Sequence, residues 1–152
     1  MSRVARAARI ASRQRPEIIT THKTITEAET GELYLINAPS DNVTITLPPI
    51  REGAYFRFQF MAEFAANKQI DIVKNAANAA GCIKGTVICI VYAGSSADTS
   101  LATNKDGGSA TQVEIQDNIH VGSYLDFYCD GTNWQVSGVC ISDNRAHVTF
   151  DA

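Results

Sequence analysis

Residues 54–64 read Ala54-Tyr-Phe-Arg-Phe-Gln-Phe-Met-Ala-Glu-Phe64, and this stretch decides the fold class. Four of the six phenylalanines in the chain fall on one side of a two-residue alternation here. Alternation of this kind over eleven residues predicts a long β-strand with one buried face. Burial of each aromatic ring contributes about 1.5–3 kcal/mol to folding. We therefore expect this strand to lie at the centre of the hydrophobic core.

Short apolar or alternating stretches separated by turn residues continue on both sides of this strand, which is typical of an all-β protein. Further strands are expected over 18–26, 32–37, 43–47, 69–73, 86–92, 112–116 and 146–150, with a hairpin over 123–138. The hairpin prediction rests on Asp130-Gly131 between two alternating runs. Residues 74–81 and 93–110 lack apolar periodicity and are predicted to be loops. The sequence predicts an antiparallel sandwich or barrel of about ten strands, jelly-roll-like or β-tulip-like.

The first sixteen residues differ from the rest of the chain in charge. They contain five of the thirteen basic residues and no acidic residue, which leaves eight basic and sixteen acidic residues, a net charge of −8, for residues 17–152. Such an asymmetry indicates that the basic segment meets a partner. We therefore divide the chain into a basic N-terminal arm, residues 1–16, and a single all-β domain, residues 17–152.

Three interpretations of the arm remain open, and the favoured one is a segment that orders on the acidic surface of a partner. A disordered tail and a targeting peptide are the alternatives. In a helix, the arginine spacing would form one stripe, and Pro16 would end that helix. Nucleic-acid binding is disfavoured, because no aromatic residue is interleaved for base stacking and the body is acidic. The residues expected to contact the partner are Arg3, Val4, Arg6, Arg9, Ile10, Arg13 and Arg15.

No combination of residues in the sequence predicts catalysis, a metal site or a cofactor. His22, His120 and His147 lie far apart, and the chain has no Gly-x-Ser-x-Gly motif. Asp126 is expected on a solvated face and Asp130 in a turn. We therefore predict that the protein is not an enzyme and has no small-molecule substrate. No apolar run reaches the roughly 20 residues that span a bilayer, so no membrane association is expected.

Glu27, Glu29 and Glu32 form an acidic patch, and we predict that their carboxylates are solvated.

The four cysteines show no zinc-site spacing. We predict that they are reduced thiols in a protein made in a cytoplasm. The cysteines are Cys82, Cys89, Cys129 and Cys140.

The stretch Thr86–Tyr92 is apolar on both faces of the predicted strand. Such a strand is either buried between layers of the same chain or buried against another subunit. The second alternative makes Val87, Ile88, Ile90 and Tyr92 a candidate subunit interface.

Several of these segments together resemble a known family. They are Gly31-Glu-Leu-Tyr-Leu-Ile-Asn37, Val43-Thr-Ile-Thr-Leu-Pro48, Gly53 before the aromatic strand, and Leu125-Asp-Phe-Tyr-Cys followed by Asp130-Gly-Thr-Asn-Trp134. Over roughly residues 30–140 the chain resembles the head decoration (cement) proteins of tailed phages and related head-fibre and tail-fibre knobs.

The resemblance implies a homotrimer on the outer surface of a phage head, seated at quasi-threefold axes and bound to the major capsid protein. In that position it would stabilise the shell. The alternative is a head-fibre or tail-fibre knob that binds a host-surface receptor. A receptor-binding knob would display aromatic residues on a tip loop, and residues 93–110 contain none beyond the flanking Tyr92. The decoration protein is therefore the favoured expectation.

Overall fold

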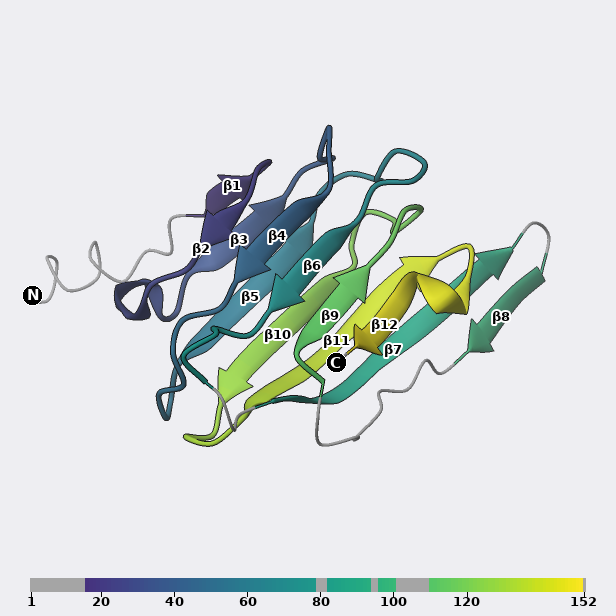
Figure 1. Cartoon of the computed structure of the whole chain (residues 1–152). Helices are drawn as coiled ribbons and strands as arrows, with labels where there is room; N and C mark the ends of the chain where they lie inside the picture. The colour runs from purple at the N-terminus through teal and green to yellow at the C-terminus, as the bar shows by residue number, and fades with distance from the viewer. Residues whose placement is uncertain (1–15, 79–81, 94–95, 101–109, 152) are drawn as a thin grey trace, which may run out of the picture.

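The computed structural model describes residues 16–78, 82–93, 96–100 and 110–151, without the side chains of residues 92, 93, 96–100 and 145. Over these residues the chain forms strands in two packed β-sheets (Figure 1). The strands are β1 (Glu17–Ile19), β2 (Lys23–Thr24), β3 (Leu33–Ile36), β4 (Val43–Thr46), β5 (Tyr55–Phe60), β6 (Ile70–Val73), β7 (Ile83–Ala93), β8 (Ser96–Ser100), β9 (Gln112–Ile115), β10 (Tyr124–Cys129), β11 (Trp134–Ser142) and β12 (Val148–Asp151).

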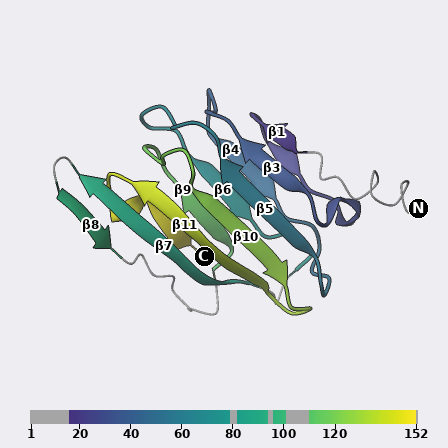
Figure 2. The same cartoon turned by 180° about the vertical axis from the view of Figure 1, so that it is seen from behind.

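Sheet A has seven strands in the order β1-β3-β5-β10-β11-β7-β8, and sheet B has five in the order β12-β9-β6-β4-β2. Sheet B lies in front in Figure 1, and Figure 2 shows sheet A from the opposite side. The helical segments of the described residues are two short 3-10 turns, η1 (Glu27–Glu29) and η2 (Arg145–His147). No described helix is long and apolar enough to cross a membrane. The prediction of an all-β sandwich is confirmed.

The first six strands alternate strictly between the two sheets, so the chain winds as a flattened coil of three turns. Each strand in one sheet is followed by a strand in the other, and the next strand in the first sheet then runs in the original direction. For this reason β1, β3 and β5 pair in parallel, as do β2, β4 and β6. With β7 and β11, five of the ten described strand pairs are parallel. The sandwich is thus mixed, and the expected antiparallel pairing holds only for the other half.

The core lies between the sheets and is built on β5, as the sequence predicts. Phe56, Phe58 and Phe60 point inward and are fully buried. The ring of Phe58 stacks on Tyr34 of β3 at 5.4 Å between centroids and meets the edge of Phe127 of β10 at 5.6 Å. Aromatic pairs at these separations add about 0.5–1.5 kcal/mol beyond their buried area. The strand with the densest aromatic alternation therefore holds β3 and β10 on either side.

The elements differ from expectation in several places. Residues 18–26, expected as one strand, form β1 and β2 in different sheets, and Ala146 and His147 belong to η2 and not to the last strand. The aromatic strand β5 ends at Phe60, and Phe64 is buried beyond the end of the strand. Strand β8 (Ser96–Ser100) pairs with β7 inside the segment predicted to be a loop. The predicted hairpin is confirmed, because β10 pairs with β11 from Tyr124↔Val139 to Cys129↔Trp134. Gly131 in its turn has φ +89°, a conformation that glycine adopts without strain.

Candidate functional site

The four predicted interface residues of β7 do not share one surface of the structure. Val87 is 1% exposed and points into the core, so its assignment to a subunit interface is wrong. Ile88 is 39% exposed and Ile90 is half-buried, and both point away from sheet B. The side chain of Tyr92 lies outside the described residues, as do all seven predicted contact residues of the arm.

Ile88 belongs to a row of side chains that crosses six strands on the outer face of sheet A, the face turned away from sheet B. Strand pairing places its members next to one another from β1 to β7. We call them the central row: Ile18, Leu35, Gln59, Tyr124, Val139 and Ile88. Five of the six are apolar or aromatic, although each occupies an outward position of its strand.

Further apolar side chains widen the two ends of the central row. At one end, Leu33 of β3 lies beside Ile18, which is 62% exposed, and Leu35. We call these three residues the β1–β3 flank. At the other end, Ile141 of β11 is paired with Ile90 of β7, next to Val139 and Ile88. We call these four residues the β7–β11 flank. Among the described residues no third layer covers either flank, and apolar area left open in this way is typical of interaction surfaces.

The middle of the outer face of sheet A is polar. Arg57 of β5 donates from Nε to Asp126 Oδ1 of β10 at 2.6 Å and from its terminal nitrogen to Oδ2 at 2.5 Å. Tyr55 donates to the same Oδ1 at 2.7 Å, and the guanidinium of Arg57 lies 4.9 Å from the centre of the Tyr124 ring. Burial of Asp126 would raise its pKa, but the hydrogen bonds from Arg57 and Tyr55 outweigh burial and lower it. Asp126 is therefore a paired carboxylate and not the solvated one that the sequence suggested.

The outer face of sheet B has the opposite character. Its outward positions hold Thr44 and Thr46 of β4 and three carboxylates, Asp71, Glu114 and Asp151, but no basic residue within the described strands. Asp71 and Glu114 stand directly opposite each other on β6 and β9. Like charges in such positions are destabilising unless water or a partner screens them. This face is suited to remain in solvent, unlike the outer face of sheet A.

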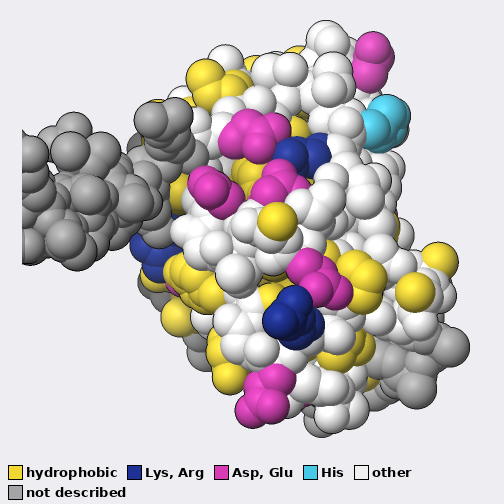
Figure 3. All heavy atoms as spheres, turned by 90° about the vertical axis from the view of Figure 1, so that its left-hand side faces the viewer, with side chains coloured by type: hydrophobic (Ala, Val, Ile, Leu, Met, Phe, Trp, Pro, Cys, Tyr) yellow, Lys and Arg dark blue, Asp and Glu magenta, His cyan; other side chains and the backbone are white. Residues whose placement is uncertain are grey.

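Acidic and basic side chains meet at the end of the sandwich formed by β1, β2 and η1 (Figure 3). Lys23 of β2 bridges Glu17 at 3.0 Å and Glu29 at 2.7 Å. Burial would raise the pKa of Glu29, but hydrogen bonds from Lys23 and Thr26 lower it to about 2. The carboxylate of Glu29 accepts from both the backbone and the hydroxyl of Thr26, so it closes the start of η1. Glu29 is therefore a structural residue and not a freely solvated charge.

A hollow of about 320 Å³ lies next to this end, between η1 and the turn that leads into β5. Its charged lining consists of Arg51, Glu27 and Glu52, and Arg51 is paired with Glu27 at 2.7 Å. Both partners are largely exposed. The rim of the hollow therefore carries an exposed salt bridge. None of the described residues that line the hollow is a buried polar residue.

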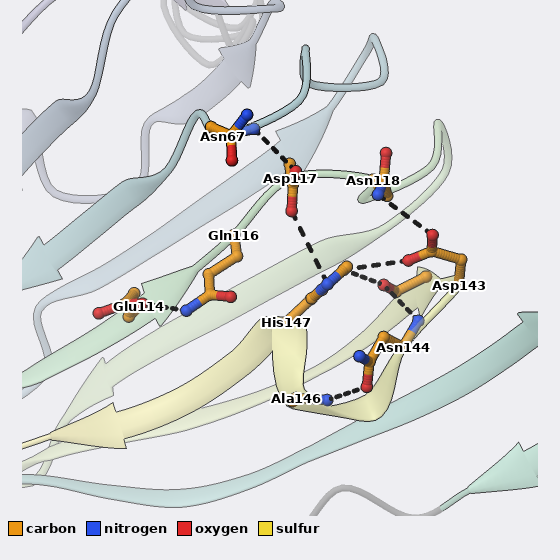
Figure 4. A network of polar contacts seen from close by, with 10 residues as sticks. Asn67, Glu114, Gln116, Asp117, Asn118, Asp143, Asn144, Ala146 and His147 are labelled. Atoms are coloured by element: carbon orange, nitrogen blue, oxygen red, sulfur yellow. Dashed lines mark hydrogen bonds and ion pairs between the residues drawn. The ribbon is translucent and has the colours of Figure 1, made fainter.

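His147 lies at the centre of a polar network that ties η2 to β11 and to the β9–β10 connection (Figure 4). Its Nδ1 is 3.0 Å from Ser142 Oγ and 3.1 Å from Asp143 Oδ1, and its Nε2 is 3.7 Å from Asp117 Oδ1. Serine, histidine and aspartate are the residue types of a hydrolytic triad. Ser142, however, is 0% exposed and also accepts a hydrogen bond from the backbone of Asn144, so a substrate cannot reach its oxygen. The network therefore has a structural role, because it holds η2 against the end of β11 and against the β9–β10 connection.

All four cysteines are free and buried. Cys89 and Cys140 are paired across β7 and β11, and burial raises the pKa of Cys89 to about 11 and that of Cys140 further. Such thiols are protonated and weakly reactive at neutral pH. No group of three or more histidine, cysteine or carboxylate side chains in the described part of the chain is arranged to hold a metal ion.

Comparison with known proteins gives no relative: no family model matches the chain, and neither a curated protein nor a solved structure is similar to it. The function is therefore inferred from the sequence and from the surfaces described above.

Proposed function

We propose that the chain is a structural virion protein, a homotrimeric decoration or cement protein that binds the major capsid protein on the outer surface of a tailed-phage head and stabilises the shell. The observation that carries the proposal is the pair of apolar flanks on the outer face of sheet A, which no other described residues cover, on a domain whose sheet B has a polar and acidic outer face. A domain with one such face acts through contacts with other chains. The resemblance of residues 30–140 to phage decoration proteins suggests which assembly this is, namely a phage head.

The basic arm supplies the second contact in this proposal. Arginine suits a protein surface rich in carboxylates, because its planar guanidinium binds a carboxylate through two hydrogen bonds and stays charged. An exposed ion pair contributes only about 0–1 kcal/mol, so one arm binds weakly. Three arms on one trimer raise the apparent affinity about 10²–10⁴-fold when all reach the same shell. Val4 and Ile10 add apolar contacts to the arginines.

Immunogold labelling of tailed-phage virions from cells that express the chain tests the proposal. Label distributed over the outer surface of the head supports it. Label confined to fibre tips favours a receptor-binding knob instead, and label absent from virions contradicts a virion function.

The role of the arm is tested by replacing all five of its arginines with alanine. We expect more than tenfold weaker binding to heads that lack their decoration, with the trimer unchanged. Lys68→Ala, which removes a basic residue of the body that pairs with Asp41 at 3.3 Å, is the control and should bind normally. Equal binding by both variants and the unaltered chain contradicts the arm hypothesis.

A further inference from the structure

The outer face of sheet A has a pattern that indicates how copies of the chain meet. We propose that the β1–β3 flank of one copy packs against the β7–β11 flank of the next, head to tail around a threefold axis. This inference rests on the trimer of the proposed function and assigns its contact surface. The partner on this face is a second copy of the chain and not the capsid.

Apolar residues gather at the two ends of the central row. Ile18 is 62% exposed at one end, and Ile88 is 39% exposed at the other. The ends differ in shape and in strand, so each complements the other more naturally than itself. A contact between unlike flanks buries both ends of every copy only when the copies form a closed ring.

The polar centre of the face lies between the flanks. Two copies packed face to face would bury the Arg57–Asp126 pair of both chains against each other. Removing charges from water is unfavourable even when the ions are paired. Three copies arranged as the walls of a triangular prism join at their flanks, and the centre of each face then lines the axis, where water can reach it.

Charge favours contact through the same face. Residues 17–152 carry a net charge of −8, so copies repel one another over most of their surface. The outer face of sheet A escapes most of this repulsion. The charged side chains at the outward positions of β1, β3, β5, β10, β11 and β7 are Arg57, Asp126 and Lys84, and Asp130 lies beside Lys84 at the rim. The outer face of sheet B, with three carboxylates, does not escape the repulsion. Of the two outer faces, only that of sheet A lets identical chains associate without a counterion between them.

The test uses the full chain with one charge placed on either flank, Ile18→Lys or Ile88→Glu, and mass measured by light scattering after size exclusion. Both positions are exposed in the single chain, so the fold tolerates the change, which far-UV circular dichroism and the emission of the buried Trp134 check. We expect the unaltered chain to be trimeric and each variant to associate at least tenfold more weakly. Thr44→Lys, at an outward position of sheet B, is the matched control and should remain trimeric.

The double variant Ile18→Lys with Ile88→Glu tests the head-to-tail pairing itself. Because each interface then brings a lysine of one copy to a glutamate of the next, we expect at least a tenfold recovery of association over either single variant. No recovery contradicts contact between the two flanks. Single variants that stay as trimeric as the control overturn the interface, and an unaltered chain that is a dimer overturns the threefold arrangement.

Failure of the interface and failure of the proposed function give different results. A trimer that depends on both flanks but does not label phage heads leaves the interface standing and contradicts the virion role. Heads labelled by a chain whose flank variants remain trimeric contradict the interface alone. A monomeric unaltered chain contradicts both.

Discussion

Gly85 illustrates how a single residue fixes the packing of two strands. It lies in β7 with φ +132°, and a Cβ added there would be 1.9 Å from the carbonyl oxygen of Val136 in β11. Glycine inside a strand marks such close backbone approaches. We predict that Gly85→Ala lowers the free energy of unfolding by about 3–5 kcal/mol, because the two strands must move apart. Urea unfolding followed by the emission of Trp134, the only tryptophan, measures this change.

Gly122→Ala is the matched control for that prediction. Gly122 also has a positive φ, +95°, but nothing lies within 4 Å of the added Cβ. Only backbone strain remains, so we expect a loss of about 1–2 kcal/mol. Equal losses for the two variants contradict a steric role for Gly85.

Glu29 gives a residue-scale prediction about pH. Its pKa is about 2 in the folded chain and 4.5 in the reference state, so its hydrogen bonds stabilise the fold fully above pH 4.5 and progressively less as the pH falls towards 2. We predict that Glu29→Gln lowers the free energy of unfolding by about 1–3 kcal/mol at pH 7. The difference from the unaltered chain should shrink between pH 4.5 and pH 2.5, as unfolding curves at several pH values will show. A difference independent of pH contradicts this account, and Glu52→Gln, at an exposed position, is the control.

The residues most accessible to sequence reasoning were those explained by their own neighbours. Asp130 was predicted to belong to a turn, and its Oδ1 accepts hydrogen bonds from the backbones of Thr132 and Asn133 at 2.8 and 2.7 Å. Asp126 was assigned to a solvated face, because its partner Arg57 is 69 residues away. Only the pairing of β5 with β10 brings the two together. Contacts of this range have no local signal in a single sequence.

The polar network around His147 predicts a local loss of stability in the last strand, β12. His147 connects η2, which leads into β12, to Ser142 and Asp117. We predict that His147→Ala lowers the free energy of unfolding by about 1–3 kcal/mol, because the buried Ser142 hydroxyl loses a partner. Hydrogen exchange of backbone amides should become faster in β12 and in its neighbour β9, with β5 and β10 unchanged.

His22→Ala provides the comparison for this element. His22 Nδ1 accepts a hydrogen bond from the backbone of Thr44 at 2.9 Å. This exposed site lies near the edge of sheet B opposite to β12. Its loss should leave exchange in β12 unaltered. A uniform increase across both sheets in His147→Ala would mean that the network supports the whole fold and not its last strand.

Strands with a clear alternation or a continuous apolar run are predicted from the sequence, whereas a strand with neither pattern is not. The run from Tyr55 to Phe60 and the hairpin with Asp130-Gly131 carry strong two-residue patterns or turn chemistry, and both form as expected. Strand β8 reads Ser96-Ala-Asp-Thr-Ser100 and has no apolar period, so only its backbone pairing with β7 defines it. The two apolar faces of β7 leave burial within the chain and burial against another subunit open, and they do not indicate that Val87 faces the core while Ile88 and Ile90 face outward.

At the scale of the whole molecule, the winding of the chain determines which surfaces exist. Alternation of β1 to β6 between the sheets makes their pairs parallel, and a pattern of hydrophobic residues does not encode which strands become neighbours. The central row of sheet A is a consequence of that order, since it joins residues from β1 to β7. The sequence therefore predicts a β-sandwich and a candidate interface on β7, but not which of its residues lie on the outer face of sheet A.

We expect the β-domain to assemble into a trimer through its own surface and to leave the basic arm free to bind a shell. The most direct measurement is the mass in solution of the full chain and of residues 17–152, by light scattering after size exclusion. We predict that the full chain has three times its chain mass of 16.4 kDa and that the shortened chain is also a trimer. A shortened chain that is monomeric while the full chain is trimeric would contradict this expectation, because the arm would then hold the copies together.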